Sequence, residues 1–211
     1  MKNKLTYVSI AFILITLFSF AYNKNKIISI EIGTKAPLSE FKMKAISGEH
    51  ISLKDLNKKN GLLVIFSCNT CPFVVGSENN EGWENRYNEL YETCEKHNVG
   101  MVLVNSNEAK RSGADSFENM KNHAFEKKYK SEYVIDKRNK LADAFGASTT
   151  PHVFLFNNSL ELVYKGAIDD NVSSRKKVTK KWTFNAITSL GKGEKITTNT
   201  TRNSGCSIKR I

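Results

Sequence analysis

Two continuous apolar runs dominate the pattern of hydrophobic and polar positions along this chain. LLVIFS at residues 62–67 and VGMVLVNS at residues 99–106 have the length of strands that are covered on both faces. Between them, apolar residues recur at helical spacing, at Trp83, Tyr87, Leu90, Tyr91 and Cys94. Strand, helix and strand at this spacing predict a parallel βαβ unit.

The later segments continue this alternation. Five of them have the length and pattern of single elements or pairs: a helix over 116–129, a strand over 133–136, a short helix over 140–146, two strands joined at Asn157–Asn158 within 149–168, and a helix near 178–190. Ahead of the first apolar run, residues 31–56 predict an extended segment with a hairpin around Ser47–Gly48. We therefore expect an α/β fold, with a mixed central sheet flanked by helices and an N-terminal β-hairpin extension.

The N-terminal segment has the layout of a secretory signal. Lys2 and Lys4 precede an uncharged apolar stretch, and small residues flank Phe20 at its end. Residues 1–21 are predicted to be a signal peptide. The alternative is an uncleaved anchor, since the 18 uncharged residues from Leu5 to Tyr22 are at the low end of a membrane span. Either way, the remaining chain is expected to be exported to a periplasmic or other extracytoplasmic compartment.

Length and charge limit the remaining possibilities. Residues 22–30 read as a linker, and residues 31–211 fit one domain. The whole chain carries a net charge of +11; without Lys2 and Lys4, 30 basic and 21 acidic residues leave +9. The densest basic run, SSRKKVTKKW at 173–182, is interpreted as a solvated helix face. We expect no nucleic-acid partner, because the chain is predicted to be exported and carries no nucleic-acid motif.

The candidate chemistry lies in the segment FSCNTCPFV, directly after the first apolar run. A strand that ends at Ser67 and a helix that begins near Pro72 would put Cys68 at a helix N-terminus, where the dipole stabilises a thiolate. Cys68 is therefore the candidate nucleophile. Cys71, expected to be buried one turn inside the helix, is the candidate resolving thiol.

A purely structural disulfide between Cys68 and Cys71 is a weaker explanation than a redox dithiol. A bridge closing a ring of four residues would contribute only about 2 kcal/mol, against nearly 5 for a loop of about a hundred residues. A zinc site would need a second pair of ligands, but Cys94 and Cys206 are single residues with no histidine nearby in sequence. We expect no metal and no cofactor.

The assembled motifs resemble the thioredoxin superfamily. The closest resemblance is to its peroxiredoxin-like thioredoxin group, the AhpC/TSA-type redoxins with a C-N-x-C-P active site. The matching segments are GTKAPLSEF (33–41), FSCNTCPFV (66–74), VLVNSNEA (102–109), LADAFGASTTPHVFLFN (141–157), VYKGAIDDN (163–171) and GCSIK (205–209). The resemblance implies a thioredoxin-like fold and a thiol–disulfide oxidoreductase that exchanges disulfides with protein substrates and relies on a separate electron donor.

The resemblance also implies a cis-proline that faces the dithiol. Thr150-Pro151 stands at the matching position. Such a bond would leave the backbone before Pro151 free to pair with an incoming extended peptide. The predicted catalytic residues are therefore Cys68, Cys71, Thr150 and Pro151.

Departures from the family pattern leave alternatives open. Leu62 stands where many thioredoxins carry a buried carboxylate, so Asp169 and Asp170 are candidate proton acceptors or simple turn residues. A thiol peroxidase with Cys68 as peroxidatic cysteine is one alternative function, although Ile65 replaces the peroxide-orienting threonine.

A copper carrier that uses Cys68, Cys71 and His152 is the other alternative, although strand alternation turns His152 away from the face of Pro151. Cys94 is interpreted as a core residue. Cys206 remains open, as a third redox thiol, a partner for Cys94 or a buried sulfur.

Overall fold

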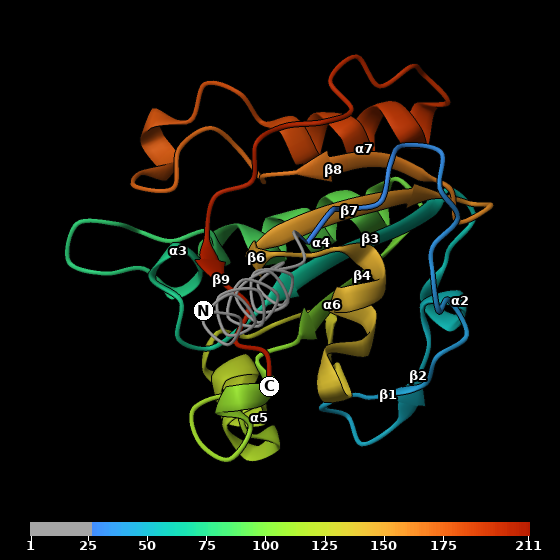
Figure 1. Cartoon of the computed structure of the whole chain (residues 1–211). Helices are drawn as coiled ribbons and strands as arrows, with labels where there is room; N and C mark the ends of the chain where they lie inside the picture. The colour runs from blue at the N-terminus through green and yellow to red at the C-terminus, as the bar shows by residue number, and fades with distance from the viewer. Residues whose placement is uncertain (1–26) are drawn as a thin grey trace, which may run out of the picture.

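The central feature is a five-stranded mixed sheet in the order β5-β4-β3-β7-β8 (Figure 1). The computed structural model describes residues 27–211, so the predicted signal or anchor over residues 1–21 lies outside the described residues. The strands are β3 (Gly61–Ser67), β4 (Val99–Asn105), β5 (Glu132–Ile135), β7 (His152–Asn157) and β8 (Leu162–Gly166). β3, β4 and β5 are parallel, whereas β7 and β8 are antiparallel to their neighbours. The predicted mixed sheet and parallel βαβ unit are both confirmed.

The helices cover both faces of this sheet. They are α2 (Leu53–Leu56), α3 (Pro72–Val75), α4 (Tyr87–Lys96), α5 (Phe117–Glu126), α6 (Lys140–Phe145) and α7 (Trp182–Lys192). Alternate residues of β3 belong to two separate cores. Leu63 and Ile65 pack with residues of α4 and α7, whereas Val64 and Phe66 pack with residues of α6. Every residue of β3 is buried, which explains why its sequence is a continuous apolar run.

Short elements complete the fold. The predicted hairpin around Gly48 is formed by β1 (Met43–Lys44) and β2 (His50–Ile51), and it joins the sheet edge where Ala45 pairs with Val134. The 3-10 turns are η1 (Glu84–Arg86), η2 (Glu108–Lys110), η3 (Lys137–Asn139) and η4 (Arg175–Lys177). A separate two-residue ladder joins β6 (Thr149–Thr150) to β9 (Cys206–Ser207), where the red C-terminal segment in Figure 1 passes close to α3.

Two predicted helix boundaries are wrong. The helix expected to include Trp83 begins only at Tyr87, because Trp83 turns to donate a hydrogen bond to Asp169 at 2.7 Å and stacks on Phe73. The last helix begins at Trp182 rather than near residue 178, since Val178 has an extended backbone. The basic run at 173–182 is therefore mostly a loop and not a helix face.

The described part of the chain, residues 27–211, contains no helix that is both long and apolar enough to cross a membrane.

Candidate dithiol site

The two cysteines lie in the segment between β3 and α3. Cys68 follows the last residue of β3, and Cys71 is the N-cap residue of α3, with an extended backbone. α3 is a single turn of four residues. The prediction that Cys68 lies at a helix N-terminus and Cys71 inside the helix is therefore wrong, because the chain stays irregular until Pro72. Cys68 is 1% exposed and Cys71 4% exposed, so both thiols are buried.

Both sulfurs meet Thr150, which comes from a distant part of the chain. Cys68 Sγ lies 3.2 Å from Thr150 Oγ1, and the Cys71 thiol donates to the backbone oxygen of Thr150 at 3.1 Å. The Thr150-Pro151 peptide is cis. The structure thus brings together all four residues predicted for the site, around a threonine that offers a hydroxyl to one sulfur and a carbonyl to the other.

The two thiols ionise as a coupled pair. The hydrogen bond between them lowers the pKa of Cys71 to about 5, and the same bond together with burial raises the pKa of Cys68 well above its ordinary value. One proton shared by two sulfurs makes the first ionisation easy and the second difficult. The low pKa was expected for Cys68 because of a helix dipole. It arises instead from the second thiol, and it belongs to the pair.

Asp115, in the segment before α5, and Tyr133 of β5 anchor the loop that carries the cysteines. The backbone N–H of Asn69 donates to Asp115 Oδ1 at 2.9 Å, and the Tyr133 hydroxyl donates to Asn69 Oδ1 at 3.0 Å. Asp115 is fully buried and also accepts hydrogen bonds from Asn105 and Asn107. These residues fix the segment between the two cysteines. Nothing in the sequence pattern singled out Asp115, because its partners are separated along the chain.

The C-terminal segment covers the site. In the β6–β9 ladder Thr150 pairs with Cys206, and the Cys206 backbone N–H donates to Cys71 Sγ at 3.4 Å. A Cβ at Gly205 would overlap the carbonyl oxygen of Thr150, so the close approach of this strand requires glycine there. The backbone before Pro151 was expected to be free for a substrate peptide. It is instead paired with the chain's own strand β9.

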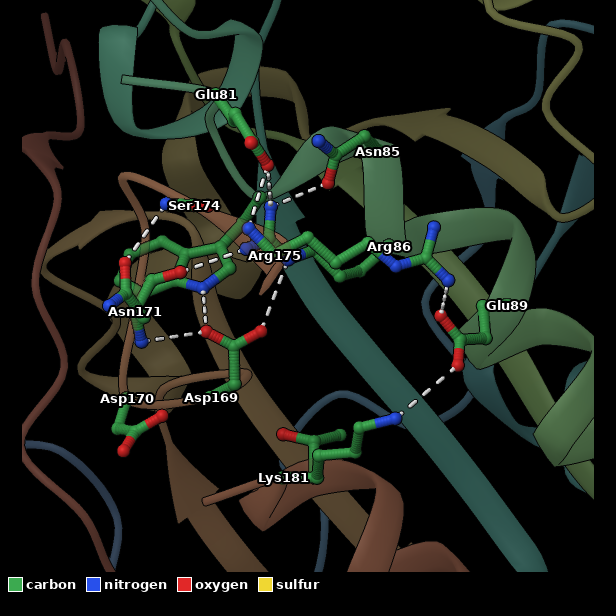
Figure 2. Close-up of polar contacts among 12 residues, drawn as sticks. Glu81, Asn85, Arg86, Glu89, Asp169, Asp170, Asn171, Ser174, Arg175 and Lys181 are labelled. Atoms are coloured by element: carbon green, nitrogen blue, oxygen red, sulfur yellow. Dashed lines mark hydrogen bonds and ion pairs between the residues drawn. The ribbon is translucent and has the colours of Figure 1, made fainter. Parts of the chain in front are cut away.

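The candidate proton acceptors have structural partners instead (Figure 2). Asp169 is 2% exposed and accepts from Trp83 and, at 3.1 Å, from the Arg86 guanidinium, which is itself 1% exposed. Arg86 also donates to backbone oxygens of Gly82 and Asn171. Asp170 is exposed and binds the backbone N–H of Thr179. The interpretation of Asp169 and Asp170 as turn carboxylates therefore fits better than a role at the thiols.

The copper hypothesis fails on geometry. His152 pairs with Phe66 across β3 and β7, and its ring lies 4.5 Å from that of Phe154. Phe66 and Phe154 belong to the core on the opposite face of the sheet from Cys68 and Cys71. Burial lowers the pKa of His152 to about 3. Within residues 27–211, moreover, no group of three or more His, Cys, Asp or Glu side chains is arranged to hold a metal ion.

Cys94 and Cys206 occupy different parts of the molecule. Cys94 is fully buried on α4, as expected for a core residue, and burial raises its pKa. Glu95, the neighbour of Cys94, pairs with Lys58, which lies just before the first residue of β3. Cys206 instead contacts Cys71, which lies beyond the last residue of β3. Since seven residues of strand span roughly 20 Å, Cys94 and Cys206 are too far apart to form a disulfide.

A cysteine pair after a central β-strand, facing a cis-proline beside the adjacent strand, places this protein in the thioredoxin-like class. The profile of the AhpC/TSA family matches residues 32–165, so the chain belongs to the AhpC/TSA family. A search of curated proteins finds no match to this chain.

Solved structures agree with this fold. A hypothetical protein from Sinorhizobium meliloti is 28% identical with a TM-score of 0.77, covering 87% of this chain and 97% of its own. An uncharacterized conserved protein from Geobacillus kaustophilus is 29% identical with a TM-score of 0.75, covering 86% of this chain and 93% of its own. The thioredoxin domain of a thiol-disulfide oxidoreductase from Bacteroides vulgatus is 18% identical with a TM-score of 0.51, covering 66% and 90%. This last likeness shows the fold alone.

Proposed function

We propose that the protein is an exported thiol–disulfide oxidoreductase that uses Cys68 and Cys71 as its redox dithiol. The observation that carries this proposal is the contact of both thiols with Thr150, beside the cis-proline, together with their mutual hydrogen bond. A pair of thiols that shares one proton has a thiolate available near neutral pH, and thiolate is the form that attacks a disulfide.

The shared proton decides which sulfur attacks. When the proton moves to Cys71, the S–H of Cys71 donates to the Thr150 carbonyl oxygen, and the Cys68 thiolate accepts from the Thr150 hydroxyl. The backbone N–H of Thr70 also favours this thiolate. Cys68 is then the nucleophile and Cys71 the resolving thiol.

The exchange reaction follows from these roles. The Cys68 thiolate attacks one sulfur of a substrate disulfide, which forms a Cys68–substrate disulfide and expels the other substrate sulfur as a thiolate. Cys71 loses its proton and attacks Cys68 Sγ, which closes the Cys68–Cys71 disulfide and releases the second substrate thiolate. Two electrons pass to the substrate, both of its thiolates take up protons, and a separate donor must reduce the protein again.

Burial restricts access to the nucleophile. Cys68 is 1% exposed, and β9 lies where an extended peptide was expected to pair with Thr150. A protein disulfide therefore reaches Cys68 only when the segments over the site move locally.

Trapping of the mixed disulfide tests this function. Reduced Cys71→Ser protein is incubated with insulin as a disulfide-containing probe, and adducts are identified by mass spectrometry without reduction. We expect an insulin peptide linked to Cys68. The Cys68→Ser/Cys71→Ser double variant should yield none, and Cys94→Ala, which removes a cysteine away from the site, should retain the ability of the wild type to reduce insulin. The proposal is wrong if Cys71→Ser forms no adduct and the wild-type protein never forms a Cys68–Cys71 disulfide in a glutathione redox buffer.

The same preparation tests the peroxidase alternative. Stopped-flow measurement of hydrogen peroxide consumption, with trapping of a sulfenic acid on Cys68, distinguishes the two activities. We expect slow consumption, because Ile65 offers no hydroxyl to orient a peroxide. Peroxide consumption that is much faster than insulin reduction would favour the peroxidase.

The export part of the proposal rests on the charge and hydropathy pattern of residues 1–21. Expression of the full chain in a bacterial host, followed by cell fractionation and mass determination, tests it. We expect protein outside the cytoplasm that lacks residues 1–21. A full-length protein in the membrane fraction would indicate the anchor instead, and full-length protein in the cytoplasm would overturn export.

A further inference from the structure

A third thiol, Cys206, touches the dithiol from the C-terminal tail. Cys71 lies within hydrogen-bonding reach of both the backbone N–H and the side chain of Cys206. Cys206 is half-buried, whereas Cys68 and Cys71 are buried. Of these three cysteines, the tail residue therefore gives a reagent in solution the easiest access.

Several bonds hold the tail in this position. Ile208 N–H donates to Ser148 O at 3.1 Å, Lys209 N–H donates to Asn107 Oδ1 at 2.9 Å, and the Asn203 side chain donates to Thr149 Oγ1 at 2.7 Å. Ile208 is itself buried. Tail residues on both sides of Cys206 are thus attached to the body of the protein, so its contact with Cys71 is built into the fold.

We propose that Cys206 is a third redox thiol, which accepts the disulfide from Cys71 and presents it to the electron donor. This step rests on the proposed Cys68–Cys71 exchange. The Cys206 thiolate attacks Cys71 Sγ of the Cys68–Cys71 disulfide, a Cys71–Cys206 disulfide forms, and Cys68 leaves as a thiolate that takes up the proton lost by Cys206. The protein remains oxidised by two electrons throughout.

The next step uses a dithiol reductant. One thiolate of the donor attacks Cys206 Sγ, the more accessible sulfur of the new disulfide, and expels Cys71 as the leaving thiolate. The second donor thiol then attacks the mixed disulfide and releases Cys206. Two electrons pass from the donor, which becomes a disulfide, and Cys71 and Cys206 become thiols.

The environments of Cys71 and Cys206 favour the second step, the attack of the donor on Cys206. A disulfide breaks most readily towards the sulfur with the lower thiol pKa. The pKa of Cys71 is lowered to about 5, whereas burial and the neighbouring Cys71 raise the pKa of Cys206 to about 11. Cleavage of a Cys71–Cys206 disulfide by an external thiol is therefore directed so that Cys71 leaves. The Phe73 backbone N–H lies against the Cys206 sulfur and favours its thiolate during the first step.

The pairing itself is tested with Cys68→Ser, which leaves Cys71 with Cys206 as its neighbouring thiol. The variant is oxidised with glutathione disulfide, alkylated and digested without reduction, and its linked peptides are identified by mass spectrometry. We expect a Cys71–Cys206 link. The inference is overturned if Cys206 stays alkylatable while Cys71 carries only glutathione.

The role in recycling is tested with Cys206→Ser, with Cys94→Ala as the matched removal of a cysteine elsewhere. The oxidised proteins are mixed with dithiothreitol, and reduction is followed by alkylation and mass shift. Because the remaining Cys68–Cys71 disulfide is buried, we expect reduction of Cys206→Ser to be roughly tenfold slower than that of wild type and Cys94→Ala. Pre-reduced Cys206→Ser should still form the Cys68–Cys71 disulfide when it reduces insulin in a single turnover, because that step uses only these two thiols.

The outcomes separate the two proposals. If Cys206→Ser is reduced by dithiothreitol at the wild-type rate, while the wild type still forms the Cys68–Cys71 disulfide and reduces insulin, Cys206 is no relay and the proposed function stands. If the wild type neither forms that disulfide nor reduces insulin, the proposed function itself fails.

Discussion

Replacement of Asp169 by asparagine should destabilise the protein through the buried ion pair with Arg86. Both side chains are almost fully buried, and the nearest other carboxylate, that of Glu81, lies 3.9 Å from the guanidinium. Asp169→Asn keeps the shape of the side chain but leaves the positive charge of Arg86 without its close partner. Removing one member of a buried pair costs about 3–5 kcal/mol. Asparagine still offers one acceptor, so we expect a loss of about 3 kcal/mol.

The assay is thermal unfolding followed by circular dichroism at neutral pH. For a domain of this size, each kcal/mol shifts Tm by roughly 2–4 °C, so Asp169→Asn should lower Tm by roughly 6–12 °C. Asp170→Asn is the matched control, since Asp170 is the next residue and is exposed. A Tm for Asp169→Asn that is as close to wild type as that of Asp170→Asn would refute the reasoning.

The same variant tests whether Asp169 accepts a proton from the dithiol. Its carboxylate is occupied by Trp83 and Arg86, so the pH dependence of thiolate formation in folded Asp169→Asn should match that of wild type. An altered thiolate titration at a temperature where the variant is folded would restore the proton-acceptor hypothesis.

Three further predictions follow from buried groups. Burial lowers the folded-state pKa of His152 to about 3, below its unfolded value. Its contribution to the free energy of unfolding is therefore complete above the unfolded pKa and is lost as pH falls. Between about pH 6.5 and 5 the free energy of unfolding should drop by roughly 1.4 kcal/mol per pH unit in urea titrations of wild type, and His152→Gln should lack this slope. Cys68→Ala should raise the pKa of Cys71, seen as an upward shift of the ultraviolet thiolate absorbance titration, because the hydrogen bond donated by Cys68 is lost; an unchanged titration would contradict the coupled pair. Asp115→Asn should lower Tm, by an amount corresponding to roughly 2–4 kcal/mol, since its buried carboxylate accepts from the Asn69 backbone and from the buried Asn105 and Asn107 side chains. It should also lower the pKa of Cys68 by removing a nearby negative charge.

The sheet was predictable because burial on both faces leaves a direct mark on sequence. Every residue of β3 and β4 is buried, so both strands appear as unbroken apolar runs. The helices after them were less precise, because a tertiary contact can override a local pattern. Trp83 has the spacing of a helical residue, but its indole N–H is used by Asp169, which lies 86 residues later.

The sequence predicted which residues of the candidate site lie together, but not the pKa values of its thiols. Cys68, Cys71, Thr150 and Pro151 were identified through motif spacing and resemblance, and the structure brings them together. The thiol environment depends on where the chain begins its helix and on which residue covers the sulfurs. A local sequence pattern determines neither feature. Pro72 permits a helix to begin but does not fix its length, and Cys206 contacts Cys71 from 135 residues away.

The position of strand β9 has a consequence for how a substrate is selected. Its backbone pairs with Thr150, and an extended peptide would need the same hydrogen-bonding groups. A bound peptide must therefore displace β9 or approach Cys68 by another path. Displacement would break the Cys206–Cys71 contact as well as the ladder, so β9 and a peptide substrate would compete for the dithiol. Because the competing strand carries its own thiol, the buried dithiol would face either a substrate sulfur or Cys206, and in the proposed cycle Cys206 returns to it after the substrate has left.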